Sequence, residues 1–277
     1  MKEKPVFYKS NVVQGEDKVN KILAKMPYKV KTSDSIVGLS SLEWERLITI
    51  DGEKAVHIGV NCDTCGFFFE RLGGANRSSI APDVLSNQLR SGLTSLDPVF
   101  IENISSLMPV GKYIVTLQEI SPTLVQLGST DDYFANEQIK VWGIDPFWGL
   151  PQYPKVQYYR GETKEFSRDE KFFEFIVPMS PPSWLDEDQV IKYDSILSNG
   201  VKPTALALSI LDIRQPADWE GDLEHTKHYC LSHYLIDGHH KVYSASSKQK
   251  PITLLSFLAL NECVATPKEI DFTLSNI

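Results

Sequence analysis

The chain has 277 residues, of which 42% are hydrophobic and 23% are charged, as is typical of a folded globular protein. Its formal net charge of -8 and the absence of a dense Lys/Arg run argue against a surface built to hold nucleic acid. The longest apolar stretch, residues 251–260, is about half of a membrane span, and four cysteines are too few for a disulfide scaffold. Because the first residues also lack a signal-peptide core, we expect a cytoplasmic protein without a membrane segment.

The first 165 residues are expected to be β-rich. Two β-rich runs flank Asp51-Gly52, a dipeptide typical of a tight hairpin turn. The pattern predicts strands at 46–50 and 54–60, a helix at 83–91 that ends at Gly92, and a strand at 112–120. A turn-rich aromatic segment follows at 145–154, and we place a domain boundary near residue 165, which separates parts 1–165 and 166–277.

Residues beyond 165 alternate regularly between strands and helices. The expected elements are a strand at 172–179, a helix at 186–198 that ends at Asn199-Gly200, strands at 203–213 and 229–236, a helix covering 242–248 and a strand at 252–260. The near-continuous apolar strand at 203–213 is typical of a sheet covered on both faces. The sequence thus predicts an α/β (α+β) protein, and it leaves open whether the N-terminal part is a separate domain or joins one sheet with the rest.

The segment with the clearest chemistry is Asp237-Gly238-His239-His240-Lys241. An apolar strand runs into an Asp-Gly turn, and the histidines and the lysine open the next helix. This order brings backbone N–H groups, imidazoles and a cation to one point, as phosphate binding requires. The alternative is that the Asp-Gly turn is an ordinary turn, and that the histidines are solvated or cap the helix.

This turn, preceded by a helix that ends in Gly and a Pro-led strand, resembles the ParB/sulfiredoxin-like domain superfamily. The resemblance covers roughly the last 110 residues, and nothing comparable is seen before residue 166. Members of the superfamily usually carry Arg at or near the position of Lys241. A lysine cannot make the fork that Arg makes to phosphate. A reductase of the sulfiredoxin kind also needs a Cys in this turn, and none is present.

The resemblance implies a nucleotide ligand such as ATP or CTP. Gly238 would let the backbone approach a phosphate, and His239, His240 and Lys241 would donate hydrogen bonds to its oxygens. Asp237 would hold Mg²⁺ or orient a histidine. The implied activity is that of a Mg²⁺-dependent phosphotransferase or nucleotide hydrolase acting on a small molecule, with Asp237, His239, His240 and Lys241 as catalytic residues. Whether the chain is an enzyme stays open, because a non-catalytic nucleotide sensor has the same turn.

A second hypothesis concerns zinc. Cys62-x-x-Cys65 has the spacing of half a zinc knuckle, and His225-x-x-His228 could complete it and staple the two parts together. The chain would then be a scaffold that binds a protein partner. The alternative is that both thiols are reduced and behave as small hydrophobic side chains. The sequence gives no indication of the oligomeric state.

Overall fold

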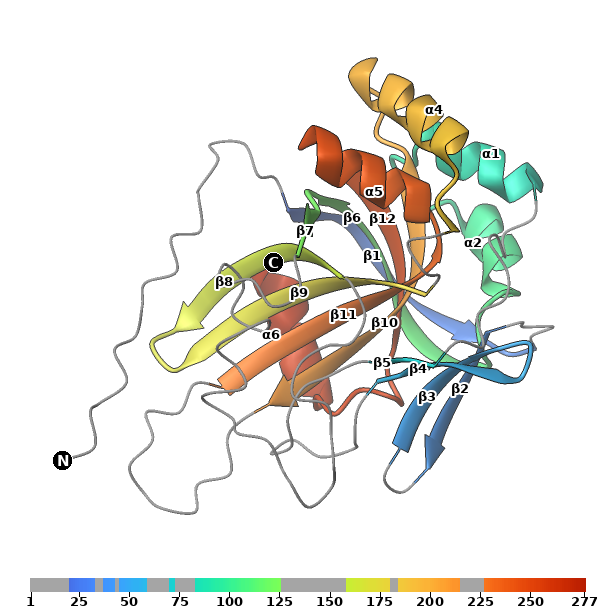
Figure 1. Ribbon diagram of the computed structural model, residues 1–277. Coiled ribbons are helices and arrows are strands. Elements are labelled where there is room, and N and C mark those ends of the chain that lie inside the picture. The colour runs from blue at the N-terminus through green and yellow to red at the C-terminus, as the bar shows by residue number, and fades with distance from the viewer. Residues whose placement is uncertain are drawn as a thin grey trace.

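The computed structural model describes residues 20–32, 37–42, 45–58, 70–72, 83–125, 158–179, 184–214 and 227–277. Within these residues it confirms a mixed α/β fold (Figure 1). The strands are β1 (Lys21–Val30), β2 (Val37–Leu42), β3 (Glu45–Ile50), β4 (Glu53–His57), β5 (Glu70–Arg71), β6 (Gly111–Ile120), β7 (Thr123–Leu124), β8 (Tyr159–Ser167), β9 (Glu170–Pro178), β10 (Thr204–Arg214), β11 (Lys227–Asp237) and β12 (Ile252–Ala259). The helices are α1 (Asp83–Ser91), α2 (Pro98–Ser105), α4 (Glu187–Ser198), α5 (His239–Lys248) and α6 (Pro267–Asn276).

Two sheets organise these strands. The large mixed sheet has eight strands in the order β1-β6-β12-β10-β11-β9-β8-β7, and the small antiparallel sheet has the order β2-β3-β4-β5. At the centre of the large sheet, β10 pairs in parallel with β12 and in antiparallel with β11, which in turn pairs in parallel with β9. The strands that the sequence predicts at 203–213 and 229–236 therefore form the centre of the large sheet.

The large sheet is strongly curled. β6 is second and β7 eighth in the order, so a flat sheet would separate them by six strand spacings, about 29 Å. The chain between Ile120 and Thr123 can span only about 11 Å. In agreement, the Gln118 side-chain amide on β6 lies 2.7 Å from a carboxylate oxygen of Glu174 on β9. The face that carries these two side chains is therefore concave, and we call it the inner face.

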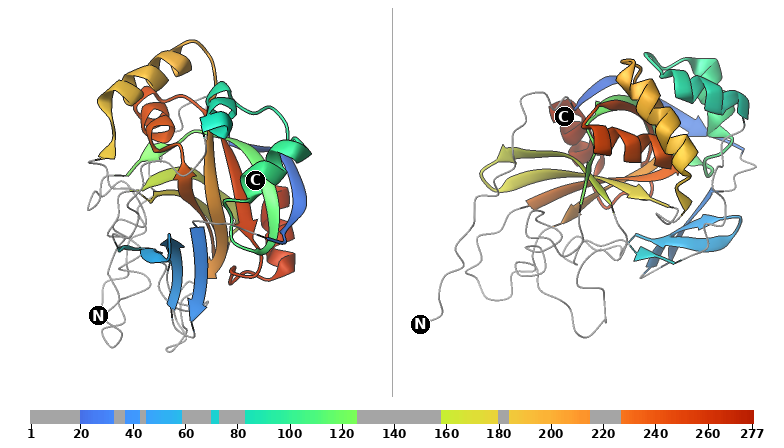
Figure 2. Two further views of the ribbon diagram at one scale, coloured as in Figure 1. Left: turned by 90° about the vertical axis from the view of Figure 1, so that its right-hand side faces the viewer. Right: turned by 45° about the horizontal axis from the view of Figure 1, so that its top comes forward.

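Helices and the small sheet cover the two faces of the large sheet. The inner face has two apolar regions: α5 packs on one through Val242 and Ala245, and α6 packs on the other through Ile270 and Leu274. The outer face forms the largest core cluster with α1, α2 and the small sheet. Figure 2 shows α4 and α5 together at one end of the molecule and the small sheet at the other.

A buried ion network joins the two sheets on the outer face. The Arg46 guanidinium on β3 binds both carboxylate oxygens of Asp212 on β10, and Arg214 donates to the same carboxylate at 2.9 Å. Burial opposes ionisation of Asp212, but the two guanidinium groups outweigh it and hold the pKa of that carboxyl below its usual value. The small sheet is thus held in place by charge as well as by apolar packing.

Most of the expected elements are confirmed. The hairpin turns at Asp51 and Gly52, whose φ values are 50° and 80°, and α1 spans residues 83–91 as predicted. The expected boundary near residue 165 falls inside β8, and β1 and β6 share the large sheet with the strands of 166–277. The strands β1, β6 and β7 of the N-terminal part therefore join one sheet with the rest, whereas β2 to β5 form the small sheet. The aromatic segment at 145–154 lies outside the described residues.

Candidate functional site

The turn between β11 and α5 depends on a glycine. Gly238 has φ 102° and ψ 21°, a left-handed conformation that side chains rarely adopt. A Cβ at this position would also lie 2.8 Å from the Cβ of Ala205 on neighbouring β10, which is closer than side-chain carbon atoms approach. The backbone can therefore turn sharply from the buried strand into the helix only because residue 238 has no side chain.

Lys241 lies beneath the turn and does not extend into solvent. Its side chain is 2% exposed, and its ammonium donates to an Asp237 carboxylate oxygen at 2.6 Å and to the Thr204 carbonyl at 2.8 Å. The ring of Tyr193 on α4 lies 5.9 Å from the same ammonium. The cation expected to bind phosphate is thus paired with the turn's own carboxylate, and two of its three N–H groups are used.

The two imidazoles accept hydrogen bonds from backbone amides. The Met179 amide donates to Nε2 of His239 at 3.1 Å, and the Asp186 amide donates to Nε2 of His240 at 2.9 Å. A ring nitrogen can accept only when it carries no proton, so both rings are neutral with the proton on Nδ1. Burial lowers the pKa of His239 to about 4 and also lowers that of His240, although Asp237 acts in the opposite direction on both.

The N-terminus of α5 has no side-chain cap, because its N-cap residue is Gly238. The first hydrogen bond of the helix runs from the Val242 amide to the Gly238 carbonyl, and the amides of His240 and Lys241 form no hydrogen bond among the described residues. α6 differs, because Thr266 and Glu269 form a complete capping box there. Uncapped amides at a helix N-terminus favour an anion through their N–H groups and the helix dipole.

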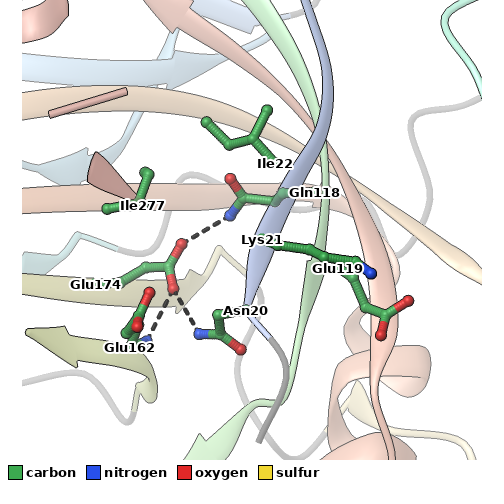
Figure 3. A pocket seen from close by; sticks show the side chains of 8 residues that line it. All are labelled: Asn20, Lys21, Ile22, Gln118, Glu119, Glu162, Glu174 and Ile277. Atoms are coloured by element: carbon green, nitrogen blue, oxygen red, sulfur yellow. Dashed lines mark hydrogen bonds between the residues drawn. The ribbon is translucent and has the colours of Figure 1, made fainter. Parts of the chain in front are cut away.

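The structure also reveals a buried polar cluster that the sequence analysis did not single out. On the inner face, Ser209 on β10 lies 2.7 Å from Nδ1 of His233 on β11, and Nε2 of that ring lies 3.1 Å from a Glu174 carboxylate oxygen on β9. Glu174 also accepts from Gln118, from Asn20 and from the Glu162 amide (Figure 3). These are polar residues at inward positions of otherwise apolar strands, and that interruption of the apolar pattern is the signal in the sequence.

The cluster has the order of a nucleophile, a base and an acid, but it is closed to substrates. Ser209, His233 and Glu174 are each exposed by 3% or less. The nearby pocket holds about one water molecule and is lined by Asn20, Lys21, Ile22, Gln118, Glu119, Glu162, Glu174 and Ile277 (Figure 3). It therefore reaches Glu174 and not the serine. We assign the cluster to the support of the curled sheet, because it connects β6 to β9 across the inner face.

The four residues of the expected zinc site are not seen together. Cys62, Cys65 and His225 lie outside the described residues. His228 is buried on β11, its ring is edge-on to Phe173 at 5.0 Å, and burial lowers its pKa to about 3. The part of the chain that the structure describes contains no group of three or more His, Cys, Asp or Glu side chains that could hold a metal ion.

Two further observations bear on the class of protein. None of the helices in the described ranges combines the length and the hydropathy that crossing a bilayer requires. No protein-family model matches the chain, and searches of curated proteins and of solved structures found no significant match either. The resemblance to the ParB/sulfiredoxin-like superfamily therefore rests on the turn and on the order of elements alone.

Proposed function

We propose that the chain binds a phosphate-bearing small molecule, a nucleotide such as ATP or CTP, at the N-terminus of α5. The observation that carries the proposal is the uncapped start of this helix after Gly238, where no side chain forms a capping hydrogen bond with the backbone amides. The helix also follows directly from β11, a central strand of the large mixed sheet, and ligands often bind at the carboxyl end of such a strand.

The charges around the turn favour a ligand that brings a metal ion. Asp237 is 14% exposed and Asp186 lies beside His240, so the surroundings of the turn are partly anionic. A nucleotide bound as its Mg²⁺ complex would offset this repulsion, with Asp237 as a candidate metal ligand. Lys241 then acts mainly as an internal brace for Asp237, and the direct phosphate contacts come from backbone amides and from the Nδ1–H group of His240.

Two versions of this function follow. In the first, the protein is a Mg²⁺-dependent phosphotransferase or nucleotide hydrolase that acts on a small molecule, with His239, His240 and Lys241 around the transferring phosphoryl group. In the second, it is a non-catalytic nucleotide sensor. The second is favoured by the Nε2 hydrogen bonds of both histidines, since they hold the rings neutral and in place. The zinc-stapled scaffold and a cytoplasmic location remain predictions from the sequence.

The test is a titration of ¹⁵N-labelled protein with Mg²⁺ complexes of ATP and CTP, observed by NMR. We expect the amide signals of residues 239–241 to shift with saturation, because they contact the phosphate directly. The Glu269 amide at the start of α6, which the Thr266 side chain caps, is the matched internal control and should not move. Shifts confined to other regions, or equal shifts at both helices, would contradict the site.

Turnover separates the two versions. An enzyme should release phosphate or ADP from Mg²⁺–ATP when candidate acceptors are added, and His240→Ala should abolish that release. Saturable binding without any release from either nucleotide would leave the sensor as the function.

A further inference from the structure

The strand β1 forms a long open edge of the large sheet. It is the terminal strand of the sheet and pairs only with β6, and residues 21–30 form no other backbone hydrogen bond within the described residues. With ten residues it is about 33 Å long, whereas β7 at the opposite end has two residues. Met26 and Tyr28 pack against the outer-face core and hold the strand in a fixed extended conformation.

Four lysines gather along this edge, and we call Lys25, Lys29, Lys31 and Lys112 the lysine patch. All four are exposed. Lys29 lies directly opposite Lys112 of β6, and Lys25 is four residues earlier and so on the same face of the strand. Lys25 donates to the Leu274 carbonyl at 3.3 Å, and in the ranges that the structure describes none of the four forms an ion pair.

Protection of the open β1 edge from pairing with other chains explains only some of the lysines in this patch. Lysines on an edge strand discourage uncontrolled pairing with other chains. Lys112, however, lies on β6, which is an interior strand. Like charges directly opposite each other on paired strands destabilise the pair, so the Lys29–Lys112 arrangement costs free energy in the isolated protein. A partner with negative charge would remove that cost, although the whole chain has a net charge of -8.

We propose that β1 binds an acidic, extended segment of a partner protein as an additional strand of the large sheet. The partner's backbone would pair with the free C=O groups of β1 and with its free N–H groups on either side of Pro27, which has none, and its carboxylates at alternate positions would face Lys25, Lys29 and Lys112. A peptide fits better than a nucleic acid, because only a peptide satisfies the open backbone edge.

The test uses a fluorescein-labelled decapeptide that alternates glutamate and valine, with binding followed by fluorescence anisotropy. We expect saturable binding that weakens as salt is added. The variant Lys29→Glu/Lys112→Glu should bind about tenfold more weakly, since two attractions become two repulsions. Lys192→Glu/Lys250→Glu is the matched control, because it makes the same charge change at two exposed lysines on α4 and after α5. This control should bind like the parent.

Two further probes test the added strand itself. A decapeptide that alternates glutamate and proline has the same charge but cannot form a ladder, so it should bind more weakly than the valine peptide. Hydrogen exchange at the β1 amides that do not pair with β6 should slow when the valine peptide is bound. Equal binding of both peptides, no loss in the Lys29/Lys112 variant relative to its control, or binding of oligo-dT in place of the valine peptide would overturn the proposal. Absence of any binding of the valine peptide would overturn it as well.

Discussion

The pair formed by Asp237 and Lys241 gives the sharpest prediction about the turn. Lys241 is 2% exposed and Asp237 is 14% exposed, so the ammonium depends on its partner more than the carboxylate does. Replacing Asp237 with Asn leaves a buried ammonium without a counter-charge, because the Thr204 carbonyl and the new amide oxygen are neutral acceptors. Replacing Lys241 with Met leaves a carboxylate that water still reaches. The first change should therefore destabilise the protein more than the second.

The magnitudes follow from the burial of each group. An unpaired buried charge costs about 3–5 kcal/mol. We expect a loss of about 3–4 kcal/mol for Asp237→Asn and about 2 kcal/mol for Lys241→Met. The double variant contains neither charge and should lose only about 1–2 kcal/mol.

Urea unfolding followed by circular dichroism measures all three free energies of unfolding. The coupling energy between the two sites should be about 3–5 kcal/mol, because each single variant leaves one charge unpaired. A loss below about 1 kcal/mol for Asp237→Asn would show that the buried ammonium does not depend on Asp237. Single losses that add up to the loss of the double variant within about 0.5 kcal/mol would show that the two charges are not coupled.

Three more predictions concern the turn and the core. Gly238→Ala should lower the free energy of unfolding by about 2 kcal/mol or more, measured by urea unfolding, because the left-handed backbone and the Ala205 contact both oppose a Cβ; a loss below about 0.5 kcal/mol would contradict the turn geometry. Asp212→Asn should lose about 3–5 kcal/mol, since it leaves two buried guanidinium groups on the outer face without their carboxylate, and calorimetry should show a lower melting temperature. Stability should also depend on the protonation of His239. The pKa of this side chain is about 4 in the folded state and near 6.5 in the unfolded state. Between pH 4 and pH 6.5 the unfolded chain therefore binds more protons than the folded chain. The stabilisation from the neutral ring is therefore fully present above pH 6.5 and is lost as the pH falls toward 4, by on the order of 2–3 kcal/mol. In His239→Gln the free energy of unfolding should depend less on pH in this range. An unchanged pH dependence would show that this ring does not control it.

Local rules predicted much of the fold. Asp51-Gly52 specifies its own hairpin, and helix-ending glycines at 92 and 200 have φ values of 86° and 80°, so these ends could be recognised from the sequence. The curl of the large sheet could not be recognised from the sequence. It depends on contacts between residues far apart in the chain, such as Gln118 with Glu174, and no local pattern specifies such a distance. The place of β1 beside β6 is equally non-local.

The candidate site also has features that the sequence predicted and features that it could not predict. The sequence placed Asp237 to Lys241 in one turn, and the structure brings them together there. It could not indicate the partners, because Thr204, Met179 and Asp186 come from other elements and use the lysine and the two imidazoles for internal hydrogen bonds. Residue types therefore predicted a cluster of donors, whereas the tertiary contacts decide which donors remain for a ligand.

The central claim, nucleotide binding at the start of α5, is tested most directly by a thermal-shift panel. It compares ATP, ADP, CTP, GTP and pyrophosphate, each with and without Mg²⁺, on the parent, His240→Gln and His240→Glu. Both variants keep an acceptor for the Asp186 amide, but the glutamate adds a negative charge at the uncapped amides. A ligand at a hundred times its dissociation constant adds about 2.7 kcal/mol, which raises the melting temperature by several degrees. We expect such a rise for at least one Mg²⁺–nucleotide complex in the parent and in His240→Gln, and its loss in His240→Glu. No rise with any compound, or an equal rise in all three proteins, would mean that no nucleotide binds at the start of α5.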